Sequence, residues 1–508
     1  MRSFAAISFL QPLIYSLQPF PVSPLLFLIL IPFVATIFMM VGAPARFTAL
    51  LASGLNLVLS LILIVRYDRV AAGWEYLQQM PVLPTLGLNF SLGADGLSLT
   101  MLLLTTLVSF SAMMITPKIE RFPSLFYGCL LLISGGLIGA FSSIDVFFLY
   151  GFHEIALIPV FIMIGVWGSG DRKAAAWKAT LYLGAGSFVV LLGIIALYLS
   201  APSGLRTFDL RLMTEMSQTG ISHPSSTIYL LLLLGFGALV SLFPFHSWAP
   251  TTYSSSPSPT AMLHAGVLKK FGLYGLLRLA LPIFPEAVFT FSTLLLVLLT
   301  CNIFYIGYVT LAQRRLDWTL SYSSVMHMGY IFLGLAAMNL ISLQGAALLM
   351  FAHGVSVAGL FALCGALRRR TGTLEYHDLG GLAAKMPVMS VLFGFTAMAS
   401  LGLPGFANFA GEVLIFFGAT AALIMEHSSV ALLIALIAAV WGVVLSAVYL
   451  LRAYRAIFFG PLSTHAEHFS LNDLTFSERC GMILLIITLI VVGIHPQFIL
   501  QLVTTAIS

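Results

Sequence analysis

Long apolar runs with very few charges constrain the fold of this chain more than any other feature. Of its 508 residues, 60% are hydrophobic and only 8% are charged, whereas soluble proteins average about 25% charged residues. A water-soluble core does not explain so large a difference, so lipid must surround most of the folded surface. The sequence therefore predicts an all-α polytopic membrane protein.

Charged and Pro- or Gly-rich stretches divide the chain into about fourteen apolar segments, each near the roughly 20 residues that a membrane-spanning helix needs. Pro244 interrupts the seventh segment, and Gly402-Leu403-Pro404-Gly405 interrupts the unusually long twelfth. Broken helices at membrane depth are tolerated only where the freed backbone meets protein or a wet cavity. Two of them, five spans apart, indicate an inverted repeat with a site at its interface. The segments lie near residues 25–43, 48–66, 97–116, 125–142, 144–167, 178–200, 228–249, 258–281, 288–311, 318–339, 342–366, 387–425, 429–452 and 482–503.

The positions of the basic residues predict an orientation in the membrane. Loops after the odd-numbered spans carry most of the Lys and Arg, including Arg172, Lys173 and Arg368 to Arg370. The positive-inside rule places these loops in the cytoplasm, so both termini face the other side. The net charge of +5 is spread over such loops, which argues against nucleic acid as a partner. The apolar N-terminal stretch has no obvious cleavage site and is expected to stay in the mature protein.

The sequence contains no sign of a cofactor or metal site. Its cysteines, Cys129, Cys301, Cys364 and Cys480, are far apart and form no CxxC pair, which argues against iron–sulfur or zinc ligation. No P-loop or G-x-G-x-x-G motif is present. The longest loops, 67–96, 201–227 and 454–478, are too short for a separate cofactor-binding domain.

A few ionisable residues fall well inside predicted spans: Glu154, Glu412, Lys269 and Lys270. A charge at the bilayer centre costs about 2.5–3.5 kcal/mol on insertion scales, and proton relays are a leading reason to keep one there. The alternative is a buried pair that only fixes helix packing. The adjacent lysines point about 100° apart on a helix, so they can face different walls. A lysine held away from water gives up its proton readily, which suits a relay.

Five histidines also lie within spans or their breaks: His153, His246, His264, His327 and His353. A lone histidine on an apolar face is more often a hydrogen-bonded core residue than a relay. His327 and His353, however, lie mid-span on consecutive helices beside glycines that leave room for water, so they are candidate proton carriers. Metal binding is less favoured, since the only adjacent pair, His153 and Glu154, should diverge on a helix.

A set of sequence pieces follows one another in a specific order and spacing. The pieces are Leu92–Ser98, His153–Gly168, Phe243–Trp248, Ala265–Arg278, Tyr322–Gly329, His353–Gly354, Asp378–Leu382, Gly402–Gly405 with Gly411–Glu412, and Phe458–Pro461. Each piece is weak alone, but the set is highly specific. Together they resemble the antiporter-like membrane subunits of respiratory complex I, above all the NADH-quinone oxidoreductase subunit M (chain 4) family. The similarity covers residues 90 to 460, most of the chain.

The resemblance implies a fourteen-helix fold with two inverted five-helix repeats and broken helices 7 and 12. Residues 1–124 would hold helices 1–3, 125–285 the first repeat (helices 4–8), 286–453 the second (helices 9–13), and 454–508 a loop with helix 14. It also implies a proton-translocating subunit, driven by quinone reduction elsewhere, among other membrane subunits of a complex I-like assembly in the bacterial inner membrane. No redox centre is expected on this chain. The implied relay residues are Glu154, Lys270, His327, His353 and Glu412.

Two departures from the family pattern leave other functions open. Leu239 stands where the family usually has a lysine that pairs with the span-five glutamate, so Glu154 is expected to be buried without that partner and protonated. The usual Trp-Leu-Pro-Asp-Ala-His is replaced by Trp248–Tyr253, followed by an uncharged Ser/Pro segment up to Thr260. The alternatives are a subunit of a cation/proton antiporter or membrane-bound hydrogenase, and a structural paralogue that conducts nothing.

Overall fold

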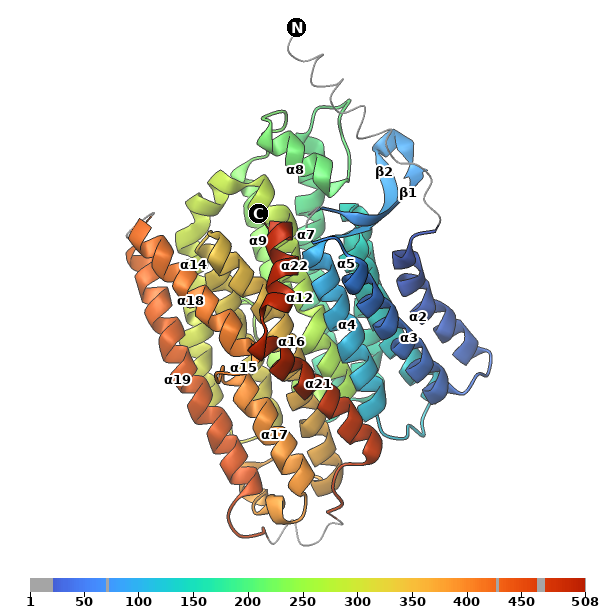
Figure 1. Ribbon diagram of the computed structural model, residues 1–508, viewed down its shortest axis with the longest axis vertical. Helices are drawn as coiled ribbons and strands as arrows, with labels where there is room; N and C mark the ends of the chain where they lie inside the picture. The colour runs from blue at the N-terminus through green and yellow to red at the C-terminus, as the bar shows by residue number, and fades with distance from the viewer. Residues whose placement is uncertain (1–21, 70–72, 426–428, 464–470, 508) are drawn as a thin grey trace.

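Helices stand side by side along one common direction in the computed structural model, which describes residues 22–69, 73–425, 429–463 and 471–507 (Figure 1). Within these residues, ten helices are long and apolar enough to span a membrane. Together with the composition, they make the chain an integral, mostly helical membrane protein. The ten are α3 (Ala45–Arg66), α4 (Gly96–Ile115), α5 (Pro123–Ser142), α6 (Val146–Trp167), α7 (Arg172–Ser200), α14 (Pro285–Leu311), α16 (Leu340–Thr371), α18 (Ala407–Met425), α19 (Val430–Phe458) and α21 (Phe476–Ile494).

Further helices complete the bundle, most of them shorter than these ten. Four are apolar: α2 (Pro24–Met40), α9 (Ser226–Val240), α17 (Pro387–Ser400) and α22 (Gln497–Ile507). The remaining ones are α8 (Leu210–Gln218), α10 (Trp248–Ser255), α11 (Ser258–Leu263), α12 (Lys270–Gly275), α13 (Leu281–Ile283) and α15 (Leu316–Ala336).

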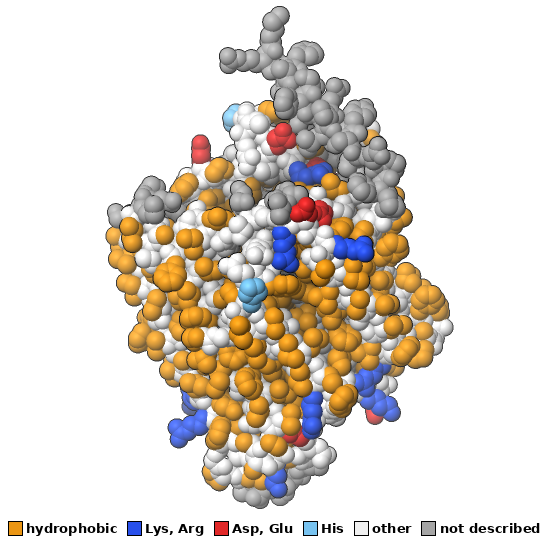
Figure 2. All heavy atoms as spheres, viewed as in Figure 1, with side chains coloured by type: hydrophobic (Ala, Val, Ile, Leu, Met, Phe, Trp, Pro, Cys, Tyr) orange, Lys and Arg blue, Asp and Glu red, His pale blue; other side chains and the backbone are white. Residues whose placement is uncertain are grey.

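The centre and the rim of the bundle differ in what their side chains meet. The apolar stretch of α16 is buried along its whole length, and α4 is buried over most of its own. At the rim, α19 exposes large apolar side chains such as Ile434, Ile437 and Trp441. Hydrophobic side chains cover the middle of the visible surface, while charged ones gather toward its two ends (Figure 2). This is the pattern of a protein whose middle faces lipid.

The helices are interrupted at both places where the sequence predicts a break. Residues 241–247 separate α9 from α10, and residues 401–406 separate α17 from α18. The second break uses positive φ angles at Gly402 and Gly405, which glycine adopts without steric penalty. At the first break, the Asn302 amide of α14 donates to Ser241 O at 3.2 Å, and its oxygen accepts from Phe243 N at 2.5 Å. The Asn302 side chain thus provides hydrogen-bond partners for backbone groups that the helix break leaves unpaired.

The predicted eighth span, 258–281, is less regular than expected. Two π-helical segments, His264–Leu268 (η2) and Leu276–Ala280 (η3), flank α12. Within η2 the Lys269 N–H donates to His264 O, five residues back, at 3.0 Å. Such π turns are rare and often mark functional sites. The first of them, η2, ends directly before the two buried lysines, Lys269 and Lys270.

Two other segments depart from the sequence-based expectation. The stretch expected to be a loop, 67–96, contains an antiparallel hairpin of β1 (Glu75–Leu83) and β2 (Leu88–Ala94), so the fold is not entirely helical. The predicted last span, 482–503, is divided between α21 and α22 around Pro496. Proline lacks the N–H that a continuous helix would need there.

Candidate functional site

Lys270, His353 and His327 form a line through the buried centre. The Lys270 Nζ on α12 lies 3.0 Å from His353 Nδ1 on α16 and donates to Ala265 O at 2.5 Å. The His353 and His327 rings are 5.4 Å apart between centroids. All three side chains are almost fully buried. Residues far apart in sequence are therefore brought to hydrogen-bonding distance in one pair and to ring contact in the other.

His327 is held so that a proton on either ring nitrogen finds an acceptor. Its Nδ1 lies 2.8 Å from Ser323 O in its own helix, α15. Its Nε2 lies 3.1 Å from Ser400 O at the end of α17, next to the second helix break. Imidazole can take a proton at one nitrogen and release one from the other. The two carbonyls hold the His327 ring between α15 and the end of α17, beside the broken twelfth span.

Glu412, on α18, is almost fully buried. It lies against Gly402 in the break between α17 and α18, where a side chain would collide with the carboxylate. Tyr330 is edge-on to the His327 ring at 5.5 Å, and both Tyr330 and Tyr449 interact electrostatically with Glu412. The Tyr330 hydroxyl is buried without a hydrogen-bond partner among the described residues. Tyr330 therefore lies close to both His327 and Glu412.

Glu154 is placed differently from the expectation of a buried, unpartnered carboxylate. Its side chain is 36% exposed, and it lines a cavity of about 240 Å³ between α6 and α7. It accepts a hydrogen bond from Ser187 of α7, and its Oε1 lies 3.5 Å from His153 Nδ1. The adjacent His153 and Glu154 side chains therefore come within ion-pair distance, contrary to the expectation that they diverge.

His153 lies between Glu154 and the central helix. Its ring stacks on Phe271, the residue after Lys270, with centroids 3.9 Å apart and planes 13° from parallel. No direct contact joins Glu154 to Lys270 among the described residues. The structure thus brings Lys270, His353 and His327 together, with Glu412 near them, and leaves Glu154 at the rim.

The two adjacent lysines face different walls, as their spacing predicts. Lys269 Nζ donates to Ser324 O of α15 at 3.1 Å, whereas Lys270 faces α16. Leu239, at the position where a lysine was expected, is buried against α7 beside Gly186, the residue before Ser187. Among the described residues, Glu154 therefore has the Ser187 hydroxyl and the His153 ring close to it.

Sequence reasoning missed several polar side chains at this site. Ser187, Tyr330, Tyr449 and Asn302 lie inside apolar helices, where such residues are common and carry no spacing signal. Only the fold reveals that Ser187 contacts Glu154, that Tyr330 contacts His327, and that Asn302 supports the first helix break. Among the described residues, no three His, Cys, Asp or Glu side chains gather as metal ligands would.

Comparisons with known proteins agree with this architecture. Residues 143–442 match the family model described as NADH:quinone oxidoreductase/Mrp antiporter, TM. A NAD(P)H-quinone oxidoreductase chain 4 of Synechococcus elongatus is 36% identical over 86% of this chain and 80% of its own. A chain of respiratory complex I from Thermus thermophilus with bound NADH superposes with a TM-score of 0.84 and 28% identity, over 95% of this chain and 98% of that one.

A more distant structure shares the fold alone. A chain of the Mrp complex from Dietzia sp. is 19% identical and has a TM-score of 0.81, with 96% of both chains covered. The resemblance seen in the sequence is confirmed by a family model that covers more than half of the chain and by a relative matched over most of its length. The chain therefore belongs to the NADH:quinone oxidoreductase/Mrp antiporter transmembrane family.

Proposed function

We propose that this chain is a proton-translocating membrane subunit of an NADH:quinone oxidoreductase (complex I)-type respiratory complex. The observation that carries the proposal is the buried line of Lys270, His353 and His327, whose contacts are 3.0 Å between Nζ and Nδ1 and 5.4 Å between ring centroids. Structural packing would be served better by apolar side chains of similar size, because buried charges are expensive to desolvate. The names of the chain 4 relative and of the Thermus complex support the same function.

In this proposal protons pass along the interior, with each group reloading from its neighbour. Lys270 gives its proton to His353, His327 receives it, and Glu412 takes it up at the second helix break. Glu154 serves at the outer end, on the surface between α6 and α7, where an adjoining subunit of the complex can approach it. No redox centre is needed on this chain, because electron transfer to quinone occurs in other subunits.

The arrangement in the membrane belongs to the same proposal. The helices form about fourteen spans, with inverted repeats over 125–285 and 286–453 between the flanking segments 1–124 and 454–508. The basic loops face the cytoplasm and both termini face the opposite side of a bacterial inner membrane. Other membrane subunits of the complex and the lipid bilayer are the partners, and nucleic acid is not one.

Proton pumping by the assembled complex tests the function. We expect Lys270→Ala and Glu412→Gln each to lower the number of protons moved per electron pair, because each removes a group that carries the proton. Lys385→Ala, which removes an exposed lysine, is the control and should leave the stoichiometry unchanged. If both test variants pump with wild-type stoichiometry, the result would favour a structural paralogue that conducts no protons, which is the alternative suggested by Leu239.

A further inference from the structure

A pocket of about 510 Å³, called the basic pocket below, lies where α3 and α21 begin and where α4 and α16 end. Positive side chains in its wall outnumber negative ones, so the pocket as a whole carries a surplus of positive charge. The charged residues that line it are Arg46, Lys118, Arg369, Arg370, Asp473 and Glu478.

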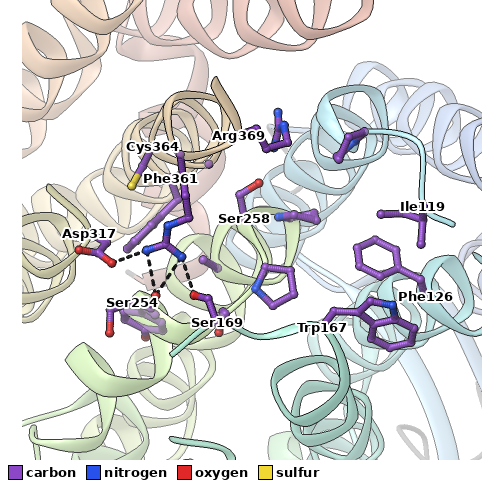
Figure 3. Close-up of a pocket in the computed structure, with 18 residues that line it drawn as sticks. Ile119, Phe126, Trp167, Ser169, Ser254, Ser258, Asp317, Phe361, Cys364 and Arg369 are labelled. Atoms are coloured by element: carbon purple, nitrogen blue, oxygen red, sulfur yellow. Dashed lines mark hydrogen bonds and ion pairs between the residues drawn. The ribbon is translucent and has the colours of Figure 1, made fainter. Parts of the chain in front are cut away.

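The consecutive arginines at the end of α16 make different contacts. Arg368 donates to Ser169 Oγ at 2.6 Å and to Asp317, beside the more apolar pocket that Figure 3 shows. Arg369 lies apart from Asp317 in the same view, and its guanidinium donates to Glu478 Oε1 at 2.7 Å. A guanidinium has five N–H donors. This bond therefore leaves other donors of Arg369 for a ligand in the basic pocket.

Both carboxylates of the basic pocket are engaged by the protein itself. Glu478 accepts from Arg370 as well, at 2.7 Å. Asp473 caps α17 by accepting from Val388 N at 2.7 Å and from Met389 N at 3.1 Å. The negative charges are thus held on one side of the pocket and leave its other cations uncompensated.

Two of these cations stand at the surface. Arg46 and Lys118 are exposed, and neither has an ion-pair partner within the part of the chain that the structure describes. The Arg46 guanidinium reaches the start of α21, where it donates to Ser477 Oγ at 3.5 Å. Guanidinium groups bind phosphate through paired N–H donors, and lysine binds it as a point charge. The surplus positive charge favours a headgroup that is negative overall.

Exposed apolar side chains flank the basic pocket. Phe47, next to Arg46, is 67% exposed, and Phe476, next to Ser477, is 83% exposed. Both α3 and α21 pack against α4 and expose further apolar side chains along their lengths. These are Leu51, Leu55 and Val58 of α3 and Ile483 and Ile487 of α21. A ligand at this place meets positive charge at one end and apolar surface beyond it, which is the pattern that suits a phospholipid.

We propose that the basic pocket binds the headgroup of an anionic phospholipid, with Arg46, Lys118 and Arg369 around its phosphate and the exposed faces of α3 and α21 along its acyl chains. The bound lipid joins the start of α3 to the ends of α4 and α16. In the orientation proposed above, this end of the bundle faces the cytoplasm, so the lipid belongs to the cytoplasmic leaflet. The inference does not depend on proton translocation.

Photo-cross-linking of the assembled complex tests the site. The complex is placed in nanodiscs of phosphatidylcholine that contain a small share of phosphatidylglycerol with a diazirine in one acyl chain, and labelled peptides are quantified by mass spectrometry. We expect this probe to label residues 47–58 and 476–487 several-fold more than phosphatidylcholine that carries the same diazirine. Equal labelling by the two probes would overturn the proposal. So would the absence of labelling by either probe, because an adjoining subunit would then cover the pocket.

A pair of matched variants assigns the preference to the basic pocket. In Arg46→Gln/Lys118→Gln, labelling by the phosphatidylglycerol probe should fall to the level of the phosphatidylcholine probe. Lys173→Gln/Lys385→Gln removes two exposed lysines outside the pocket and should keep the wild-type preference. An undiminished preference in Arg46→Gln/Lys118→Gln would refute the assignment. If that variant fails to assemble, the comparison of the two probes on the wild-type complex decides alone.

Discussion

The buried ion pair between Asp95 and Arg278 anchors the helix that carries the two lysines. Asp95 caps α4 by accepting from Ser98 N at 3.0 Å, and the same carboxylate binds the Arg278 guanidinium of η3. The two residues are 4% and 8% exposed. Arg278 also lies over the Trp74 ring, 4.9 Å from its centre. The pair therefore joins the start of α4 to the far end of the π-helical span.

Asp95→Asn isolates the energy of this pair. Asparagine caps a helix about as well as aspartate, so the bond to Ser98 N survives while the negative charge disappears. Arg278 is then left as an uncompensated buried charge, which costs about 3–5 kcal/mol. We expect the free energy of unfolding to fall by about that amount, a large part of the roughly 5–15 kcal/mol that stabilises a typical domain.

Equilibrium unfolding in mixed detergent micelles measures this loss. The matched control is Asp171→Asn, which alters the exposed cap of α7 and should change stability by no more than about 0.5 kcal/mol. In Asp95→Asn/Arg278→Met both charges are absent, so most of the lost stability should return. A loss in Asp95→Asn no larger than in the control would refute the reasoning, because the arginine would then be solvated.

Two further predictions concern the first broken span and the outer glutamate. Asn302→Leu should lower the free energy of unfolding by about 1–3 kcal/mol for each backbone group left unpaired, and should expose residues 241–247 to protease. Unchanged stability and protease resistance would contradict that role for the amide. Leu239→Lys should add a lysine beside α7, close to the Ser187 that bonds Glu154, and change the infrared carboxyl signal of Glu154 in a pH titration. An identical titration in wild type and variant would rule this out.

The two helix breaks could be predicted from the sequence, because they follow from the local chemistry of proline and glycine. Proline at 244 and the Gly-Pro-Gly turn at 402–405 interrupt spans because proline lacks an N–H and glycine adopts positive φ angles. The hairpin at 75–94 was not foreseen, since its pairing depends on contact with the bundle, such as the bond from Asn89 N to the Asp145 carboxylate. The π turns on either side of α12 were not foreseen either, because they depend on packing between helices.

Residue types alone indicate that lipid surrounds this chain and that a small set of ionisable residues lies inside it, because the energy of transferring a side chain out of water depends first on its type. The tertiary structure decided which of these groups meet. It turned Lys270 toward His353 and Lys269 toward Ser324, and left Glu154 at the rim with Ser187. Such contacts join helices far apart in the chain, and only their packing brings the side chains within reach of one another.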